Sequence, residues 1–187
     1  MNKEITLKYT MTYGLYLGLA FSIVVRILNF KGVIHYPGDL GATINAMILS
    51  FGMLYSGRRY FTTIGQEVVS YRQALKFLIL LVFFSSLIYA FFSYWYYSVI
   101  QPEGISFYIQ QMQNAYLQMG TFTEEQINAL TDLYSKTLTP GMMAFIVFFA
   151  QSFFGVLLSL VMAVALKTKI KIQWLNFLLF NMKYKKI

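Results

Sequence analysis

Apolar residues gather in four long runs that are separated by polar segments. These runs cover residues 9–28, 40–56, 74–97 and 141–166. A bilayer core about 30 Å thick needs about 20 mostly apolar residues in a helix, because lipid offers bare peptide groups no hydrogen-bond partner. The first run is long enough for a retained helix rather than a cleavable signal peptide. The pattern predicts an all-α membrane protein, a four-transmembrane-helix bundle in which residues 1–187 form a single membrane domain.

The segment between the third and fourth runs, residues 98–139, is polar but patterned. Apolar residues recur at helical spacing on both sides of Gly120, which is expected to end a helix. Beyond it, Thr123 and Gln126 have the spacing of a capping box. We therefore expect an extracytoplasmic helical hairpin between spans 3 and 4. It either shields the mouth of the bundle or offers a docking surface to a partner.

In the tail, residues 167–187, cations alternate with large apolar side chains, and the apolar core is too short to span a bilayer. This composition predicts a C-terminal interfacial amphipathic helix that binds anionic headgroups at the cytoplasmic face. The tail is either a simple anchor or a recognition element. Its candidate headgroup-binding residues are Lys167, Lys169, Lys171, Trp174, Lys183, Lys185 and Lys186.

The basic residues are distributed unequally between the two predicted sides of the membrane. The chain has 15 Lys and Arg against 7 Asp and Glu, a net charge of +8. Of those 15, 12 lie on the side of the two termini, and only Arg26, Lys31 and Lys136 lie on the other. The positive-inside rule then places both termini in the cytoplasm. Orientation thus accounts for the basic charge, and no nucleic acid is expected as a partner.

Composition limits the possible chemistry. Apolar residues make up 58% of the chain, which has no cysteine and one histidine. Cysteine nucleophiles, disulfides and a multi-histidine metal site within one chain are therefore excluded. His35 and Asp39 are too few for a metal site, and Pro37 and Gly38 between them predict a turn. We expect no catalytic residue, no metal and no cofactor; Glu124 and Glu125 fit the first turn of a helix.

Three polar residues lie inside the predicted spans: Arg26, Asn45 and Gln151. Arg26 is near the outer end of its span, where it can reach water or pair with Asp39. Asn45 and Gln151 can either join helices through hydrogen bonds or line a pathway. The spans hold no carboxylate in their interiors, which argues against an ion channel or a proton-coupled transporter.

Small residues recur at every fourth position in two of the spans. They are Gly14, Gly18 and Ser22 in the first span, and Gly155, Ser159 and Ala163 in the fourth. Such faces let helix backbones approach closely in a membrane. They predict either packing within the bundle or a seam with a second copy or another membrane protein.

Several short segments carry a family likeness. They are a glycine-rich first helix, GRRY at 57–60, SYRQA at 70–74 and YSVIQP at 97–102. Over roughly residues 5–168 the chain resembles domain-of-unknown-function family 4199, small four-span proteins of the bacterial inner membrane. This resemblance implies the fold and the location, and it implies no catalytic or binding residue.

These observations favour a non-catalytic accessory or structural subunit of an inner-membrane assembly. The alternative is a small-solute or lipid-handling transporter, and a membrane enzyme is the third possibility. An accessory subunit requires a membrane-protein partner or a homodimer, whereas a transporter requires a polar cavity near Arg26, Asn45 or Gln151.

Overall fold

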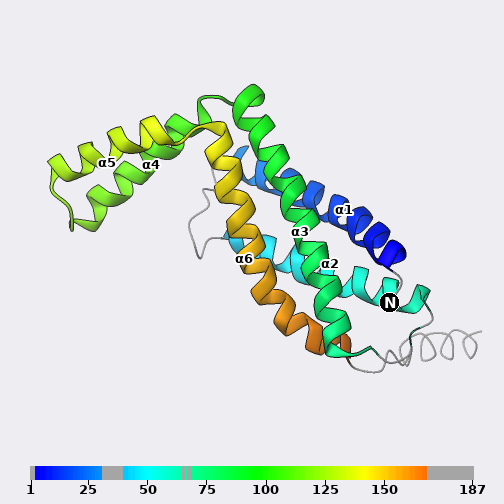
Figure 1. The fold of residues 1–187 in the computed structure, drawn as a ribbon. Coiled ribbons are helices and arrows are strands. Elements are labelled where there is room, and N and C mark those ends of the chain that lie inside the picture. Colours follow the sequence, from blue (N-terminus) through cyan, green and yellow to red (C-terminus); the bar gives the residue numbers. More distant parts are fainter. Residues whose placement is uncertain (1–2, 31–39, 65, 67–68, 168–187) are drawn as a thin grey trace, which may run out of the picture.

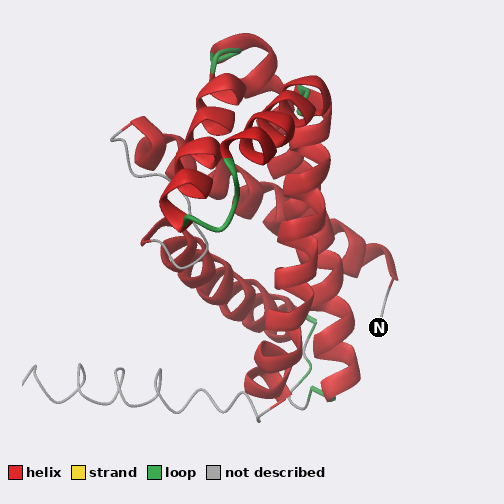
Figure 2. Ribbon diagram, turned by 90° about the vertical axis from the view of Figure 1, so that its left-hand side faces the viewer, coloured by secondary structure: helices red, strands yellow, loops and turns green. Residues whose placement is uncertain are grey.

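The structure, a computed structural model, describes residues 3–30, 40–64, 66 and 69–167. Within these residues every regular element is a helix and none is a strand, which confirms the all-α prediction (Figure 2). The elements are α1 (Lys3–Phe30), α2 (Leu40–Thr63), α3 (Tyr71–Trp95), the π-helical turn η1 (Tyr96–Ile100), α4 (Gly104–Met119), α5 (Glu124–Thr137) and α6 (Pro140–Lys167).

Helix α3 is central to the fold. It packs most extensively against α1 and α6, which lie along two different faces of α3. Helix α2 crosses behind them (Figure 1). Helices α4 and α5 pack against each other and project from one end of the molecule (Figure 1). The start of α1, the end of α2, the start of α3 and the end of α6 lie together at the opposite end (Figure 1).

A cluster of aromatic rings joins α1, α2 and α3 near that opposite end. The side chain of Tyr60 is fully buried, and its ring stacks on that of Phe77 with centroids 4.6 Å apart. The ring of Phe61 meets Tyr60 edge-on at 4.9 Å. The Tyr60 hydroxyl and the Thr6 hydroxyl share a buried hydrogen bond of 2.6 Å. Tyr60 therefore links α2 to both of its neighbours.

Local sequence signals set several helix ends. Ser70 caps α3, and its side chain accepts a hydrogen bond from the Gln73 amide while the Gln73 side chain accepts one from the Ser70 amide. Thr123 and Gln126 form the same reciprocal pair at the start of α5, which confirms the predicted capping box. Gly120 ends α4 with φ of 64°, a left-handed conformation that glycine adopts without strain.

Helix α2 extends beyond the apolar run that predicts it. The run ends at Ser56, but the helix continues through Arg58 and Arg59 to Thr63. Arginine is a good helix former, so the loss of apolar character at this point does not end the hydrogen-bonded backbone. The apolar run marks the hydrophobic part of the helix rather than its full length.

Two helical stretches among the described residues are long and apolar enough to cross a membrane. They are Tyr71–Ile100, which combines α3 and η1, and Pro140–Lys167, which is α6. They correspond to the third and fourth predicted spans.

Candidate functional site

The small-residue face of α1 lies against α3. A Cβ atom on Gly14 would lie 2.6 Å from the Phe84 Cβ atom, and one on Gly18 would lie 2.6 Å from the Ile88 Cβ atom. Ser22 continues this face, where it is fully buried and donates a hydrogen bond of 2.8 Å to the Gly18 carbonyl. The two backbones therefore approach more closely here than side chains would permit.

The small-residue face of α6 also lies against α3. A Cβ atom on Gly155 would lie 2.5 Å from Cγ1 of Val82. Ser159 and Ala163 are fully buried, and the Ser159 hydroxyl donates to the Gly155 carbonyl at 2.7 Å. Both faces are thus occupied within the chain, so neither is free to form a seam with a second copy.

Arg26 lies in a cluster of three aromatic rings, which we call the arginine cluster. Its Cζ atom is 3.4 Å from the ring centroid of Tyr96, 5.3 Å from that of Tyr97 and 6.0 Å from that of Phe92. Its Nε atom is buried and has no hydrogen-bond partner in the described part of the chain. The guanidinium group is therefore stabilised by the negative faces of the rings. The partner that the sequence suggested, Asp39, lies outside the described residues.

Replacing Arg26 by methionine keeps an unbranched, though shorter, apolar side chain and removes the charge. We expect the free energy of unfolding to fall by about 0.5–2 kcal/mol, because the cation–π attraction to Tyr96 is lost. Thermal unfolding in detergent micelles, followed by circular dichroism, measures this loss. Arg72→Met is the matched control, since Arg72 is exposed at the start of α3. Equal melting of both variants and the wild type would contradict a stabilising role for the arginine cluster.

Asn45 and Gln151 are half-buried on α2 and α6. The Oδ1 atom of Asn45 is buried and has no hydrogen-bond partner among the described residues. Neither of two grooves on the surface of the described residues is lined by Asn45, Gln151 or Arg26. Neither groove is therefore the polar cavity near Arg26, Asn45 or Gln151 that a transporter would require.

The first groove runs along one face of α2 and has a volume of about 420 Å³. Its lining residues are Phe51, Leu54, Tyr55, Arg58, Arg59 and Thr62. The second groove, of about 660 Å³, lies between α3 and α6 and is almost wholly apolar. We call the first one the α2 groove. Its residues were not singled out as a site from the sequence, although their spacing of three and four residues is visible there.

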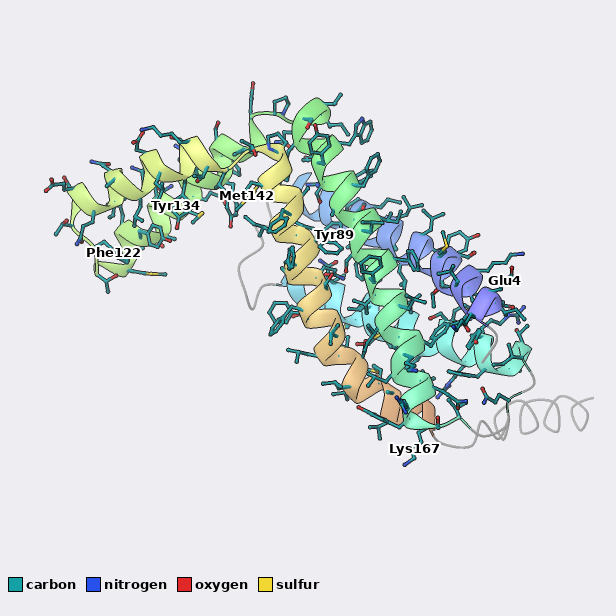
Figure 3. The ribbon with its side chains drawn as sticks, in the orientation of Figure 1. Glu4, Tyr89, Phe122, Tyr134, Met142 and Lys167 are labelled. Carbon is teal, nitrogen blue, oxygen red and sulfur yellow. The ribbon has the colours of Figure 1, made fainter. Side chains whose placement is uncertain are left out.

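Helices α4 and α5 and the loop between them are joined by aromatic and polar contacts, to which Phe122 and Tyr134 contribute (Figure 3). The ring of Phe122 meets that of Tyr116 edge-on at 5.3 Å, and the hydroxyls of Tyr116 and Tyr134 are 3.5 Å apart. The hydrogen bond between the two hydroxyls raises the pKa of Tyr116 above its usual value. Lys136 and Asp132 form an exposed ion pair on α5. Pairs of this kind contribute little to stability.

The titratable residues of the described segments do not converge. No group of three His, Asp or Glu side chains in the described segments could hold a metal ion. Glu124 and Glu125 occupy the first turn of α5, where the helix dipole favours acids. Lys167 is exposed at the end of α6. The remaining predicted residues of interest lie outside the described residues: His35, Asp39, Lys169, Lys171, Trp174, Lys183, Lys185 and Lys186.

Comparison with models of protein families gives a match over most of the chain. A family model described as "Protein of unknown function (DUF4199)" matches residues 12–168. The match includes all of α2 to α6 and most of α1. The chain matches no curated protein and no solved structure.

Proposed function

The chain belongs to the DUF4199 family of proteins of unknown function, and from its geometry we propose that it is a non-catalytic accessory or structural subunit of an assembly in the bacterial inner membrane. Four helices span the bilayer in this proposal: α1, α2, α3 with η1, and α6. Helices α4 and α5 form a hairpin outside the cytoplasm, and both termini are cytoplasmic.

The exposed apolar faces of the four long helices carry the membrane placement in this proposal. The side chain of Phe51 is 73% exposed, that of Phe91 72%, that of Phe154 67% and that of Ile23 55%. These residues belong to four different helices, and each has further exposed apolar neighbours at helical spacing. Soluble monomers rarely expose large contiguous apolar patches. A bilayer around all four helices would cover these side chains without a second protein.

The positions of the charged residues support the proposed orientation. Exposed cations lie at the end of α2, at the start of α3 and at the end of α6, where these helix ends lie together (Figure 1). They are Arg58, Arg59, Arg72, Lys76 and Lys167. The acids of α5, together with Glu103 at the start of α4, lie at the other end. This asymmetry matches the positive-inside rule, with the α4–α5 hairpin outside.

Cysteine labelling tests the proposed orientation in this cysteine-free chain. On the proposed cytoplasmic side we choose exposed Thr63 at the end of α2, because nearby Ser70 caps α3 and its replacement would disturb that helix end. Thr63→Cys is expected to react with an impermeant maleimide only after spheroplasts are permeabilised. Asn128→Cys on α5 is expected to react in intact spheroplasts. The reverse pattern of labelling would overturn the proposed topology.

Genetic complementation tests the proposed role. Neutral replacement of each outer titratable residue is expected to leave any cellular phenotype nearly intact, because a subunit that works through contact needs no proton transfer. The residues to replace singly are His35, Glu103, Glu124, Glu125 and Asp132. Crosslinking in native membranes followed by mass spectrometry is expected to identify a particular protein partner. Loss of function at one of these residues, with normal protein level and assembly, would instead favour an enzyme or a transporter.

A further inference from the structure

We propose that the α2 groove binds one anionic phospholipid of the cytoplasmic leaflet, with its phosphate at Arg58 and Arg59 and an acyl chain along Phe51 and Tyr55. This inference rests on the proposed placement of α2 across the membrane. This lipid site is distinct from the headgroup binding predicted for the C-terminal tail, because it lies in a groove on a helix that is proposed to span the membrane.

The order of the side chains along α2 matches the order of the parts of a lipid. With 3.6 residues per turn, Phe51, Tyr55, Arg58 and Thr62 fall on one face of the helix. At 1.5 Å per residue, Phe51 lies about 10 Å from Arg58 along the axis. The apolar half of the groove thus lies within the bilayer, and the cationic half lies at the cytoplasmic interface.

The groove is open to an occupant. Phe51 and Tyr55 are 73% and 65% exposed, and both arginine side chains are exposed. Among the described residues neither guanidinium group forms an ion pair, since the ion pair found there joins Lys136 and Asp132. Two adjacent guanidinium groups offer several N–H donors to phosphate oxygens, a geometry that suits bidentate binding. The volume of about 420 Å³ falls within the range of small-molecule sites.

Charge and polarity favour a lipid over the other candidate occupants. Residues 168–187 carry five lysines and no acid, so the arginines would repel this tail. A second copy docked through the same face would bring Arg58 and Arg59 against their own counterparts. An acidic soluble peptide would leave the apolar half of the groove without a complementary surface. An anionic phospholipid complements both halves.

Lipid retention by the purified full-length protein tests the proposal. The protein is exchanged into detergent micelles with equal amounts of phosphatidylglycerol and phosphatidylcholine, and mass spectrometry measures the lipid that co-purifies. The wild type is expected to retain phosphatidylglycerol preferentially. The double variant Arg58→Gln with Arg59→Gln is expected to retain about tenfold less of it, because two interfacial cations are lost. Equal retention of the two lipids by the wild type would overturn the proposal.

A matched variant separates the groove from general surface charge. Arg72→Gln with Lys76→Gln removes the same charge from exposed positions at the same end of the molecule, and it is expected to retain lipid like the wild type. An equal loss in both double variants would overturn the proposal. Arg58→Lys with Arg59→Lys keeps the charge but loses the bidentate donors, so it is expected to retain an amount of lipid between those of the wild type and of the double glutamine variant. Size-exclusion profiles and melting curves that match the wild type establish that each variant is folded.

Two further measurements test the apolar half and the choice of lipid over free phosphate. Phe51→Ala with Tyr55→Ala is expected to reduce retention of long-chain phosphatidylglycerol severalfold, because acyl contacts are lost. Inorganic phosphate at the same concentration as the lipid is expected not to displace it. Unchanged retention in this variant, or full displacement by phosphate, would overturn the lipid assignment. The Thr63→Cys labelling reports the membrane placement separately, so failure of the lipid site and failure of the proposed topology are distinguishable.

Discussion

Gly18→Leu is expected to separate α1 from α3 and to lower the free energy of unfolding by about 3 kcal/mol. A Cβ atom at this position would lie 2.6 Å from the Ile88 Cβ atom and 2.8 Å from the Ser85 carbonyl oxygen. The carbonyl belongs to the α3 backbone, which cannot rotate away as a flexible side chain can. Because close approach supplies much of the attraction between membrane helices, the added bulk removes that attraction along the whole face.

The same reasoning predicts a loss at Gly155, where a Cβ atom would lie 2.5 Å from Val82 Cγ1. Gly141→Leu is the matched control, because Gly141 lies in α6 as well and a Cβ atom there would meet only the Thr139 hydroxyl, at 3.9 Å. Thermal unfolding in micelles and the amount of protein in membranes measure the effect. If Gly18→Leu melted at the same temperature as Gly141→Leu, the close contact between α1 and α3 would be wrong.

Local signals in the sequence predicted the helix ends best. Thr123 and Gln126 cap α5 as their spacing indicates, and Gly120 ends α4 as expected. These features depend only on residues within a few positions of one another, so the chemistry of the free amides and of left-handed glycine decides them. Hydrophobic runs likewise predicted which segments are helical, but not how far α2 continues past Ser56.

Contacts between distant segments could not be predicted in the same way. The spacing of Gly14, Gly18 and Ser22 fits packing against any helix, and only the fold identifies α3 as the partner. Arg26 suggested a nearby acid, and that pairing with Asp39 stays a prediction because Asp39 lies outside the described residues; the described groups around Arg26 are the rings of Phe92, Tyr96 and Tyr97. An aromatic partner carries no charge opposite to that of Arg26. The sequence therefore does not show which of the chain's many aromatic rings contacts the guanidinium group.

Helix α3 explains how these contacts form one structure. It packs α1 and α6 through their small residues, and its aromatic end, continued by η1, surrounds Arg26. Its other end supplies Phe77 to the buried ring cluster. Helix α2 has fewer contacts with α3, so one of its faces stays open as the α2 groove. The proposed lipid therefore occupies the helix face that the fold leaves uncovered.

Tyr60→Ala is expected to have the other large effect, a loss of about 3–5 kcal/mol in the free energy of unfolding. The Tyr60 side chain is fully buried, so its removal leaves a cavity between α1, α2 and α3. The substitution removes the stacking on Phe77, 4.6 Å between centroids, and the 2.6 Å hydrogen bond to Thr6. It therefore weakens the attachment of α2 to both neighbouring helices at once.

Two further variants separate these contributions. Tyr60→Phe keeps the ring and loses the hydroxyl, so we expect a smaller loss of about 1 kcal/mol. Tyr55→Ala removes a tyrosine from the same helix that is 65% exposed, and it should change stability little. Urea or thermal unfolding in micelles measures the stability of Tyr60→Ala, Tyr60→Phe and Tyr55→Ala. A Tyr60→Ala protein as stable as Tyr55→Ala would mean that α2 is not held by this ring cluster, because a cavity of that size cannot form without cost in a packed core.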